Sequence, residues 1–340
     1  MTDFKSLLET KDYEFLKTNT HLDDNIILLC LGGSHAYGTN NENSDVDFRG
    51  IALNSKSEIL LGNDFDQVVN VNTDTVMYSF NKIIKLLSSC NPNTIEILGC
   101  NPEDYMYLSD VGSDLIDNRK MFLSKICIHT FGGYAGGQLR RMENKAARVA
   151  GQTQNEQHIL KSIRNAKYEF KNRYFPCSDS SVNLYVDNAV QKGYDSEIFM
   201  DVNLSHYPLR DWAGMWAEMK SIVGSYNKMG KRNEKAISHN KLGKHMAHLI
   251  RLYMMCIDIL EKEEIITYRS EEHDLLMSIR NGDYLDDNVQ PKPEFYDLLN
   301  QYEERFEYAK QNTSLPDVPD YKSIDEFRMC VNERIVKGEL

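Results

Sequence analysis

The sequence predicts an α/β fold of the α+β kind, in which a small mixed β-sheet core is followed by a mostly helical second domain. Two observations predict it. Up to about residue 118, apolar runs of strand length alternate with stretches of helical spacing, and beyond residue 119 helical spacing dominates. A chain of 340 residues is long enough for two domains. We therefore expect a sheet domain over residues 1–118 and a mostly helical domain over residues 119–340.

The first strand is expected at residues 26–31, an unbroken apolar run that Gly32 and Gly33 end, as is typical of a strand buried on both faces. Further strands are expected around residues 46–53, at 68–71 and at 75–78. Ser79 then suits the cap of a helix through residues 83–87. The Asn91-Pro92-Asn93 segment interrupts this helix, and Thr94 is expected to open another turn or two.

The second half of the chain contains several stretches of helical spacing. They are expected at residues 159–170, 212–222 and 241–261, and a last helix is expected to begin at the capping box Ser323 to Glu326. The apolar residues in these stripes are expected to face a core. Segments 174–208 and 283–322 hold most of the prolines and are expected to be long ordered loops.

Composition excludes several classes of protein. The longest apolar run is far shorter than the roughly 20 residues of a membrane-spanning helix. The seven cysteines form no CxxC pair, which argues against a zinc ribbon or a disulfide framework. We therefore expect a reduced, cytoplasmic protein without a membrane partner.

Charge is unevenly distributed along the chain. The net charge of −12 argues against a non-specific nucleic-acid binder. Residues 119–175, however, carry 12 Lys and Arg against 3 Asp and Glu, whereas residues 1–118 carry 7 against 19. The basic segment therefore favours an RNA partner, and the acidic total favours a protein or small molecule.

The most informative stretch, LGGSHAYGTNNENSDVDFRG, runs from Leu31 to Gly50. A strand that ends in Gly-Gly-Ser and turns into a short helix presents backbone N–H groups to an anion, and phosphate is the natural ligand. The Gly-Gly-Ser turn and the following Asp45-x-Asp47 pair are each weak evidence alone, but the two in this order are a restrictive pattern. No Gly-Lys-Ser/Thr follows the glycines, and their spacing is not G-x-G-x-x-G, so a Walker A loop and a Rossmann site are both disfavoured.

Asp45 and Asp47 are two residues apart on a predicted strand, so their carboxylates are expected on one face. Neighbouring carboxylates repel each other unless a cation lies between them, and Mg²⁺ (or Mn²⁺) bound to carboxylates and substrate phosphates is the common solution. Two-metal chemistry at phosphorus usually requires a third carboxylate. Asp74, at the start of the strand candidate 74–78, is our first choice, and Glu96 is the reserve.

The motif resembles the signature of the DNA polymerase β-like nucleotidyltransferase superfamily, since Gly33-Ser34 is followed eleven residues later by Asp45-x-Asp47. The string GSHAYGTNNENSDVDFRGI is similar to its bacterial and phage branch of predicted nucleotidyltransferases, the RNA-3′-ligase-associated type. Later segments that also resemble this branch are Asn91-Pro92-Asn93 with Glu96 and Leu98, Tyr134-Ala135-x-Gly137-Gln138 with Arg141, and His248-x-x-Arg251-Leu252.

The resemblance implies a nucleotidyltransferase core in residues 1–118. It implies Mg²⁺ held by Asp45 and Asp47, and a nucleoside triphosphate such as ATP held through Gly33 and Ser34. The enzyme would move a nucleoside monophosphate to an acceptor hydroxyl and release pyrophosphate, with Asp74 or a metal-bound hydroxide taking the proton. An RNA 3′ end, such as that of a tRNA, is the leading acceptor. The alternatives are a protein or small-molecule acceptor, or a non-catalytic nucleotide- or RNA-binding module.

Nucleotide contacts are expected from Arg49, which would share the strand face of Asp47, and from His248 and Arg251. For Arg49, a salt bridge that holds the two carboxylates in place is an equal alternative. Lys244, His248 and Arg251 fall on one face of the 241–261 helix, so Lys244 is assigned to the acceptor, with a solvated surface stripe as the alternative.

Acceptor contacts are also expected from Tyr134, Gln138 and Arg141, which share a helical face within the basic segment. The glycines beside them, at 132, 133, 136 and 137, would each weaken an isolated helix by about 1 kcal/mol relative to alanine. Either close packing of this helix on the core or close approach of its backbone to a ligand would compensate for this loss of helix stability.

Overall fold

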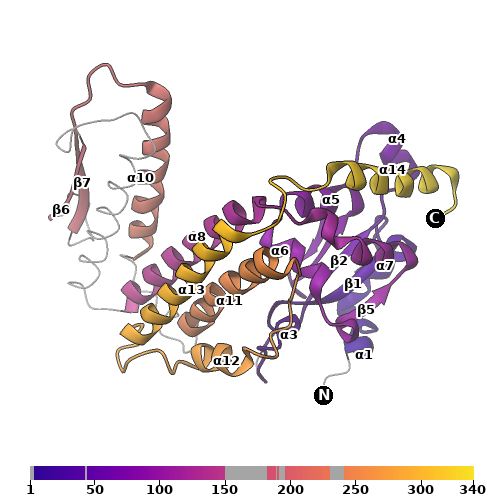
Figure 1. Cartoon of the computed structure of the whole chain (residues 1–340), viewed down its shortest axis with the longest axis horizontal. Coiled ribbons are helices and arrows are strands. Elements are labelled where there is room, and N and C mark those ends of the chain that lie inside the picture. The colour runs from indigo at the N-terminus through magenta and orange to yellow at the C-terminus, as the bar shows by residue number, and fades with distance from the viewer. Residues whose placement is uncertain (1–3, 43, 150–181, 189, 191–195, 230–240) are drawn as a thin grey trace. The chain divides into compact units, whose positions relative to one another are not determined.

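The computed structural model describes the chain except residues 1–3, 43, 150–181, 189, 191–195 and 230–240 (Figure 1). The predicted stripe at 159–170 and much of the basic segment lie outside the described residues.

A five-stranded mixed sheet has the strand order β3-β4-β2-β1-β5. The strands are β1 (Ile26–Gly32), β2 (Asp47–Ala52), β3 (Gln67–Asn70), β4 (Thr75–Ser79) and β5 (Tyr105–Leu108). Only β2 and β4 pair in parallel, and the mixed α/β fold is confirmed.

The α-helices of the described part are α1 (Phe4–Leu8), α2 (Phe15–Thr18), α3 (Gly33–Ala36), α4 (Lys56–Leu61), α5 (Phe80–Ser88), α6 (Pro92–Ile95), α7 (Asp110–Asp117), α8 (Ile126–Val149), α10 (Leu209–Met229), α11 (Lys241–Lys262), α12 (His273–Asn281), α13 (Pro293–Asn312) and α14 (Tyr321–Lys337). Short 3₁₀ helices occur at Lys11–Tyr13, Asp23–Asn25, Glu96–Gly99, Pro102–Asp104 and Arg119–Phe122. Among the residues that the structure describes, no helix is both long and apolar enough to cross a membrane.

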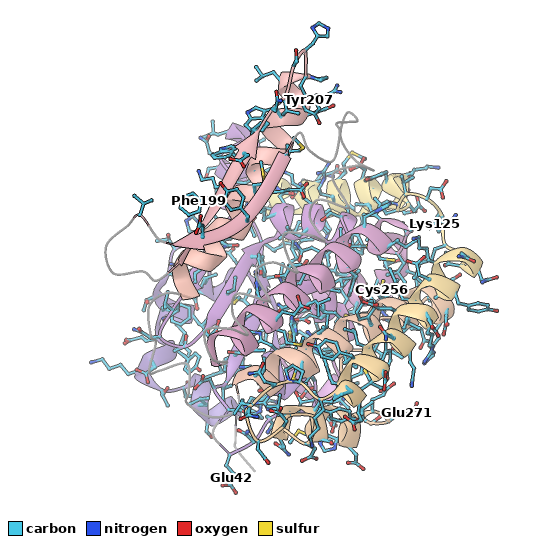
Figure 2. All side chains as sticks on the ribbon, turned by 90° about the vertical axis from the view of Figure 1, so that its left-hand side faces the viewer. Glu42, Lys125, Phe199, Tyr207, Cys256 and Glu271 are labelled. Carbon is cyan, nitrogen blue, oxygen red and sulfur yellow. The ribbon has the colours of Figure 1, made fainter. Side chains whose placement is uncertain are left out.

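The two faces of the sheet are covered by different elements. Leu28 and Cys30 of β1 point into a large core with α5, α7, α8, α11, α13 and α14, whereas Leu29 and Leu31 pack with Tyr13 and the other residues of the N-terminal helices. The first strand is therefore buried on both faces, as predicted. In the larger of these two cores, Cys256 of α11 is buried among the helices. Glu271, by contrast, is exposed (Figure 2).

Local signals fixed several boundaries. The Ser79 side chain accepts a hydrogen bond from the Lys82 N–H and caps α5, as predicted. The turn expected to open at Thr94 begins instead at Pro92, because the Asn91 side chain caps the helix and proline suits its first position. The last helix begins at Tyr321 rather than at Ser323, because Asp320 is the residue that caps it.

Two expected loop segments contain regular structure. Residues 174–208 include β6 (Val182–Asn188) and β7 (Ser196–Val202), which pair in antiparallel fashion. Residues 283–322 include all of α13. The prolines in these segments lie at or outside the ends of these elements, where proline is compatible with both structures. The prediction of long loops was therefore wrong for these elements.

The chain forms two compact units. Unit 1 comprises residues 1–137, 247–279 and 296–340, and unit 2 comprises residues 138–246 and 280–295. The segment expected to form a separate helical domain, 119–340, thus contributes to both. In unit 2, Met215 and Met219 of α10 are buried with Val182 of β6, as the helical spacing predicts, while Trp216 is 48% exposed.

Candidate active site

The Gly-Gly-Ser turn lies directly against the Asp-x-Asp segment. Strand β1 ends at Gly32, which pairs with Asp47 of β2. Gly33 follows with a φ of +55°, and a Cβ atom there would fall 1.8 Å from Oδ2 of Asp47. Only glycine allows both this backbone conformation and the close approach of the carboxylate. The phosphate-binding turn and the Asp47 carboxylate predicted from sequence are therefore neighbours in space.

The two aspartates of the motif differ in their setting. Strand β2 begins at Asp47, which is partly buried, so Asp47 and Arg49 share one face by strand alternation. Asp45 lies two residues before the strand and is exposed. Their oxygen atoms suit Mg²⁺, which is commonly held by one or two carboxylates together with substrate phosphates. Within the described ranges, no three His, Cys, Asp or Glu side chains come together as a metal-binding group.

Asp74 lies at the start of β4, beside the site. Since Phe48 of β2 is paired with Thr75, Asp74 precedes the strand next to Asp47. Arg49 donates to the Asp74 backbone carbonyl, and its Nη2 atom lies 3.3 Å from Oδ1 of Asp74. A salt bridge of Arg49 was one of the two predicted interpretations, and the partner found is Asp74. The exposed fraction of Asp74 is 63%, so this ion pair positions the two side chains more than it stabilises the fold.

A buried network connects the helix after the Gly-Gly-Ser turn to α11. The Tyr37 hydroxyl donates to the Glu96 carboxylate at 2.9 Å, and Arg251 Nη1 lies 3.3 Å from Glu96 Oε2. The Arg251 guanidinium carbon lies 3.5 Å from the centre of the Tyr37 ring, in cation–π geometry. Burial raises the pKa of Glu96, and the Arg251 charge opposes this shift. Glu96, the reserve metal ligand, is thus already engaged by two partners.

Arg251 also determines the hydrogen-bonding state of His248. Its Nη2 atom lies 3.1 Å from Nδ1 of His248. A guanidinium has only donors, so Nδ1 accepts and the ring is neutral with its proton on Nε2. Arg251 is only 3% exposed, and its Nε atom has no partner among the described residues. His248, which is partly exposed, is therefore better placed than Arg251 to contact a nucleotide.

The Glu96–Arg251 pair is expected to be strongly coupled. Glu96→Gln should lower the free energy of unfolding by about 3 kcal/mol, because it leaves the buried Arg251 charge without its counter-ion. Arg251→Leu should cost less, since Glu96 can take up a proton, and the double variant should be more stable than the sum of the single effects implies. Urea unfolding of the four proteins measures this coupling, and simple additivity would contradict it.

The residues assigned to the acceptor have different environments. In unit 1, the Tyr134 hydroxyl accepts a hydrogen bond from the Asn93 side chain. In unit 2, Gln138 is buried and its Oε1 atom has no partner among the described residues, whereas Arg141 and Lys244 are exposed. Of the glycines beside Tyr134, Gly133, Gly136 and Gly137 have open space where a Cβ would lie. Close packing on the core therefore does not explain why glycine occupies these three positions.

Sequence reasoning missed the link between Tyr37 and Glu96. Each residue was noted separately, Tyr37 within the turn motif and Glu96 as a spare carboxylate. The apolar surroundings of Glu96, in the sequence Thr-Ile-Glu-Ile-Leu, were the available signal that this carboxylate is buried. A buried carboxylate requires an opposite charge or hydrogen-bond donors as partners.

Comparisons with known proteins agree with this geometry. Residues 8–168 match the RlaP family model, described as the RNA repair pathway DNA polymerase beta family. An uncharacterized 38.9 kDa protein of Enterobacteria phage T4, from the nrdC-mobD intergenic region, is 30% identical over 131 residues. This match covers 35% of the present chain and 39% of the phage protein. No solved structure matches the chain.

Proposed function

We propose that this protein is a Mg²⁺-dependent nucleotidyltransferase that acts on an RNA 3′ end, because residues 8–168 match the model of the RNA repair pathway DNA polymerase beta family. The observation that carries the proposal is the contact between the Gly33 turn and the Asp47 carboxylate. A triphosphate on the turn would lie beside the carboxylates that hold its cation. The family match supports the nucleotidyltransferase class, and the family description and the basic segment 119–175 favour RNA as the acceptor.

In the proposed reaction, the acceptor hydroxyl oxygen forms a bond to the α-phosphorus of the nucleoside triphosphate. The bond between that phosphorus and the bridging oxygen breaks, and pyrophosphate leaves. Mg²⁺ held by Asp45 and Asp47 would supply charge stabilisation to the attacking and leaving oxygens. Asp74 would accept the proton of the hydroxyl. Arg49 and the Nε2–H of His248 would donate hydrogen bonds to the triphosphate, whose orientation on Gly33 and Ser34 aligns the leaving group.

The test is to incubate the purified protein with Mg²⁺, each labelled nucleoside triphosphate in turn and a pool of small RNAs. Pyrophosphate release and label on RNA, on protein and on small molecules are measured together. The expected result is label on RNA with matching pyrophosphate, lost when EDTA is added. Label on protein or on a small molecule would overturn the RNA acceptor. If no acceptor gives pyrophosphate, the assignment as an enzyme is wrong and a nucleotide- or RNA-binding module is favoured.

A further inference from the structure

The segment that joins α11 to α12 runs beside α3 in unit 1 (Figure 1). Residues 265–269 read Ile-Ile-Thr-Tyr-Arg, and buried side chains alternate there with partly buried ones. This alternation is typical of an extended chain with one inward side. The inward Arg269 is 2% exposed and forms an ion pair with Asp258 of α11. Because breaking a buried ion pair is costly, this pair fixes the end of the segment to the helix.

The backbone of the 265–269 segment ties two loops of the candidate site together. The Arg269 N–H donates to the Tyr37 carbonyl at 3.2 Å, directly after α3. The Thr267 N–H donates to the Gly99 carbonyl at 3.1 Å, and the Thr267 hydroxyl donates to the Glu96 carbonyl at 2.7 Å. The end of α3 and the turn that carries Glu96 are therefore held by the same five residues.

The side chain of Tyr268 packs on the residue that follows Tyr37. Gly38 has a φ of +71°, and a Cβ atom there would fall 2.5 Å from Cε2 of Tyr268. The ring therefore lies against the Gly38 backbone, at a position where only glycine leaves room for it. Tyr268 is partly buried, and its hydroxyl forms no hydrogen bond within the described part of the chain. The contact between Tyr268 and Gly38 is thus one of packing.

Gly38 belongs to the same closed turn as the residues proposed to hold the triphosphate. The Tyr37 N–H donates to the Gly33 carbonyl at 3.2 Å, and the Thr39 N–H donates to the Ser34 carbonyl at 2.9 Å. A displacement of Gly38 would break the second of these bonds and open the turn at Ser34. Helix α3 has only four residues and is far too short to be stable alone. The shape of the turn therefore depends on the contacts that other segments make with it.

We propose that Tyr268 is a positioning residue for the nucleoside triphosphate. By packing on Gly38, its ring holds the turn of residues 33–39 in the shape that binds the phosphates. This inference rests on the proposed function, which places the triphosphate on Gly33 and Ser34. Tyr268 acts through the backbone of the turn and touches no reacting atom. Without its ring the turn would also adopt open conformations, and the nucleotide would bind only the closed fraction.

Nucleotide affinity is measured by calorimetry in Mg²⁺ with the α,β-methylene analogues of ATP, GTP, CTP and UTP, which bind but cannot transfer their nucleotide. Tyr268→Ala should weaken binding about tenfold, the effect of a turn that is closed in about a tenth of the molecules. Tyr268→Phe keeps the ring and should bind like the unchanged protein. In the transfer assay, KM for the nucleotide should rise by the same factor, and kcat should stay within about twofold because saturating nucleotide selects the closed turn.

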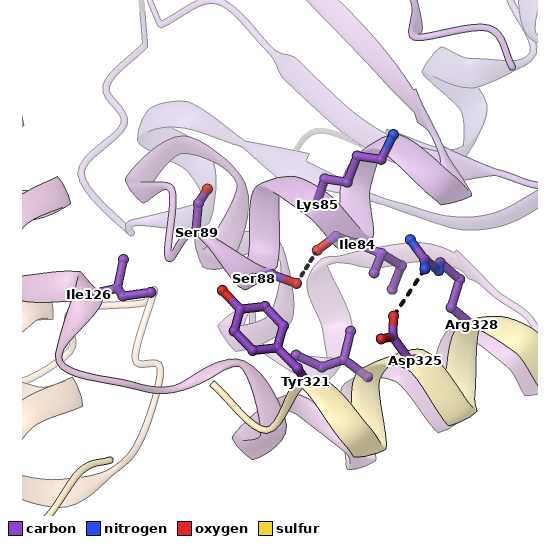
Figure 3. A pocket seen from close by; sticks show the side chains of 9 residues that line it. Ile84, Lys85, Ser88, Ser89, Ile126, Tyr321, Asp325 and Arg328 are labelled. Atoms are coloured by element: carbon purple, nitrogen blue, oxygen red, sulfur yellow. Dashed lines mark hydrogen bonds and ion pairs between the residues drawn. The ribbon is translucent and has the colours of Figure 1, made fainter. Parts of the chain in front are cut away.

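Two control variants remove a tyrosine ring elsewhere in unit 1. Tyr253 of α11 is partly buried against Phe306 and donates to Glu303 at 3.0 Å, so Tyr253→Ala costs stability away from the turn. Tyr321 of α14 lines a pocket of about 340 Å³ against α5 (Figure 3). Both Tyr253→Ala and Tyr321→Ala should bind the analogues like the unchanged protein.

Hydrogen exchange followed by mass spectrometry reports on the turn directly. In Tyr268→Ala, the peptide that contains the Thr39 amide should exchange faster than in the unchanged protein, and saturating nucleotide should slow it again. The same peptide should be unaffected in Tyr253→Ala. Faster exchange over the whole chain of Tyr268→Ala would reveal a general loss of stability and overturn the positioning role.

The outcomes separate this inference from the proposed function. Unchanged affinity in Tyr268→Ala overturns the positioning role even if transfer is observed. Equal losses in Tyr268→Ala and Tyr268→Phe also overturn it, because the hydroxyl would then contact the nucleotide directly. Nucleotide binding that depends on the Tyr268 ring, without transfer to any acceptor, refutes the enzyme and not the role of Tyr268. Absence of nucleotide binding by the unchanged protein overturns both.

Discussion

Replacement of both Asp45 and Asp47 by asparagine is expected to lower nucleotidyl transfer by at least about a thousandfold. The two carboxylates would hold the cation that stabilises charge on the attacking and leaving oxygens, a contribution of several kcal/mol. Asparagine has nearly the same shape, Asp45 is exposed and Asp47 is only partly buried, so the fold should be retained. Pyrophosphate release at saturating Mg²⁺ measures the loss, and the urea midpoint measures the fold.

The matched control for this variant is Asp114→Asn with Asp117→Asn on α7. It removes the same two charges from exposed positions on a surface helix, so it separates a local effect at the site from a change in net charge. Its transfer rate should equal that of the unchanged protein. Full activity in the Asp45 and Asp47 variant, or equal losses in both variants, would contradict the assigned cation site.

Gly33→Ala is expected to lower kcat/KM by about a hundredfold and the free energy of unfolding by about 1–2 kcal/mol. The positive φ at this position disfavours any residue with a Cβ, which accounts for the stability loss. The activity loss has a separate cause. The new methyl group would overlap Oδ2 of Asp47, so the carboxylate must move by about 1 Å, and a displacement of that size costs about a hundredfold in rate.

Gly62→Ala distinguishes these two causes. Gly62 ends α4 with a φ of +67°, close to that of Gly33, but its Cβ would meet no atom within 4 Å. This variant should lose a similar amount of stability and keep full transfer activity. If Gly33→Ala and Gly62→Ala have the same activity, the contact between the turn and Asp47 has no catalytic importance.

Much of the sheet was predictable because its strands carry local signals. The unbroken apolar run of β1 reflects burial on both faces, and Ser79 supplies a cap that depends only on neighbouring residues. Strand β5 was missed because it is a short edge strand held by pairing with β1, a contact distant in sequence. Strands β6 and β7 do show alternation, at Val182, Leu184 and Val186 for example, but the nearby prolines favoured loops.

The candidate site was predictable only in part, for the same reason. The motif spacing predicts a Gly33 turn at the end of one strand and Asp47 on the next strand, and β1 and β2 are indeed paired there. Helical spacing places His248 and Arg251 on one face, where they are in contact. The partner of Arg251, however, is 155 residues away, and the side chain that engages Arg49 is reached through strand pairing. Sequence patterns indicate which face a side chain occupies, whereas these long-range partners depend on the packing of the whole unit.

The discontinuous composition of unit 1 has a consequence for synthesis on the ribosome. The five strands are complete by Leu108, but α11 supplies Leu252, Met255 and Ile259 to the core over the sheet, and Arg251 neutralises Glu96. A nascent chain shorter than about 250 residues therefore lacks the part of this core that α11 supplies, and its Glu96 carboxylate lacks the Arg251 counter-ion. Long-range contacts of this kind slow folding, and the exposed intermediates are prone to aggregation. The core over the sheet therefore cannot be completed until the last third of the chain has been translated.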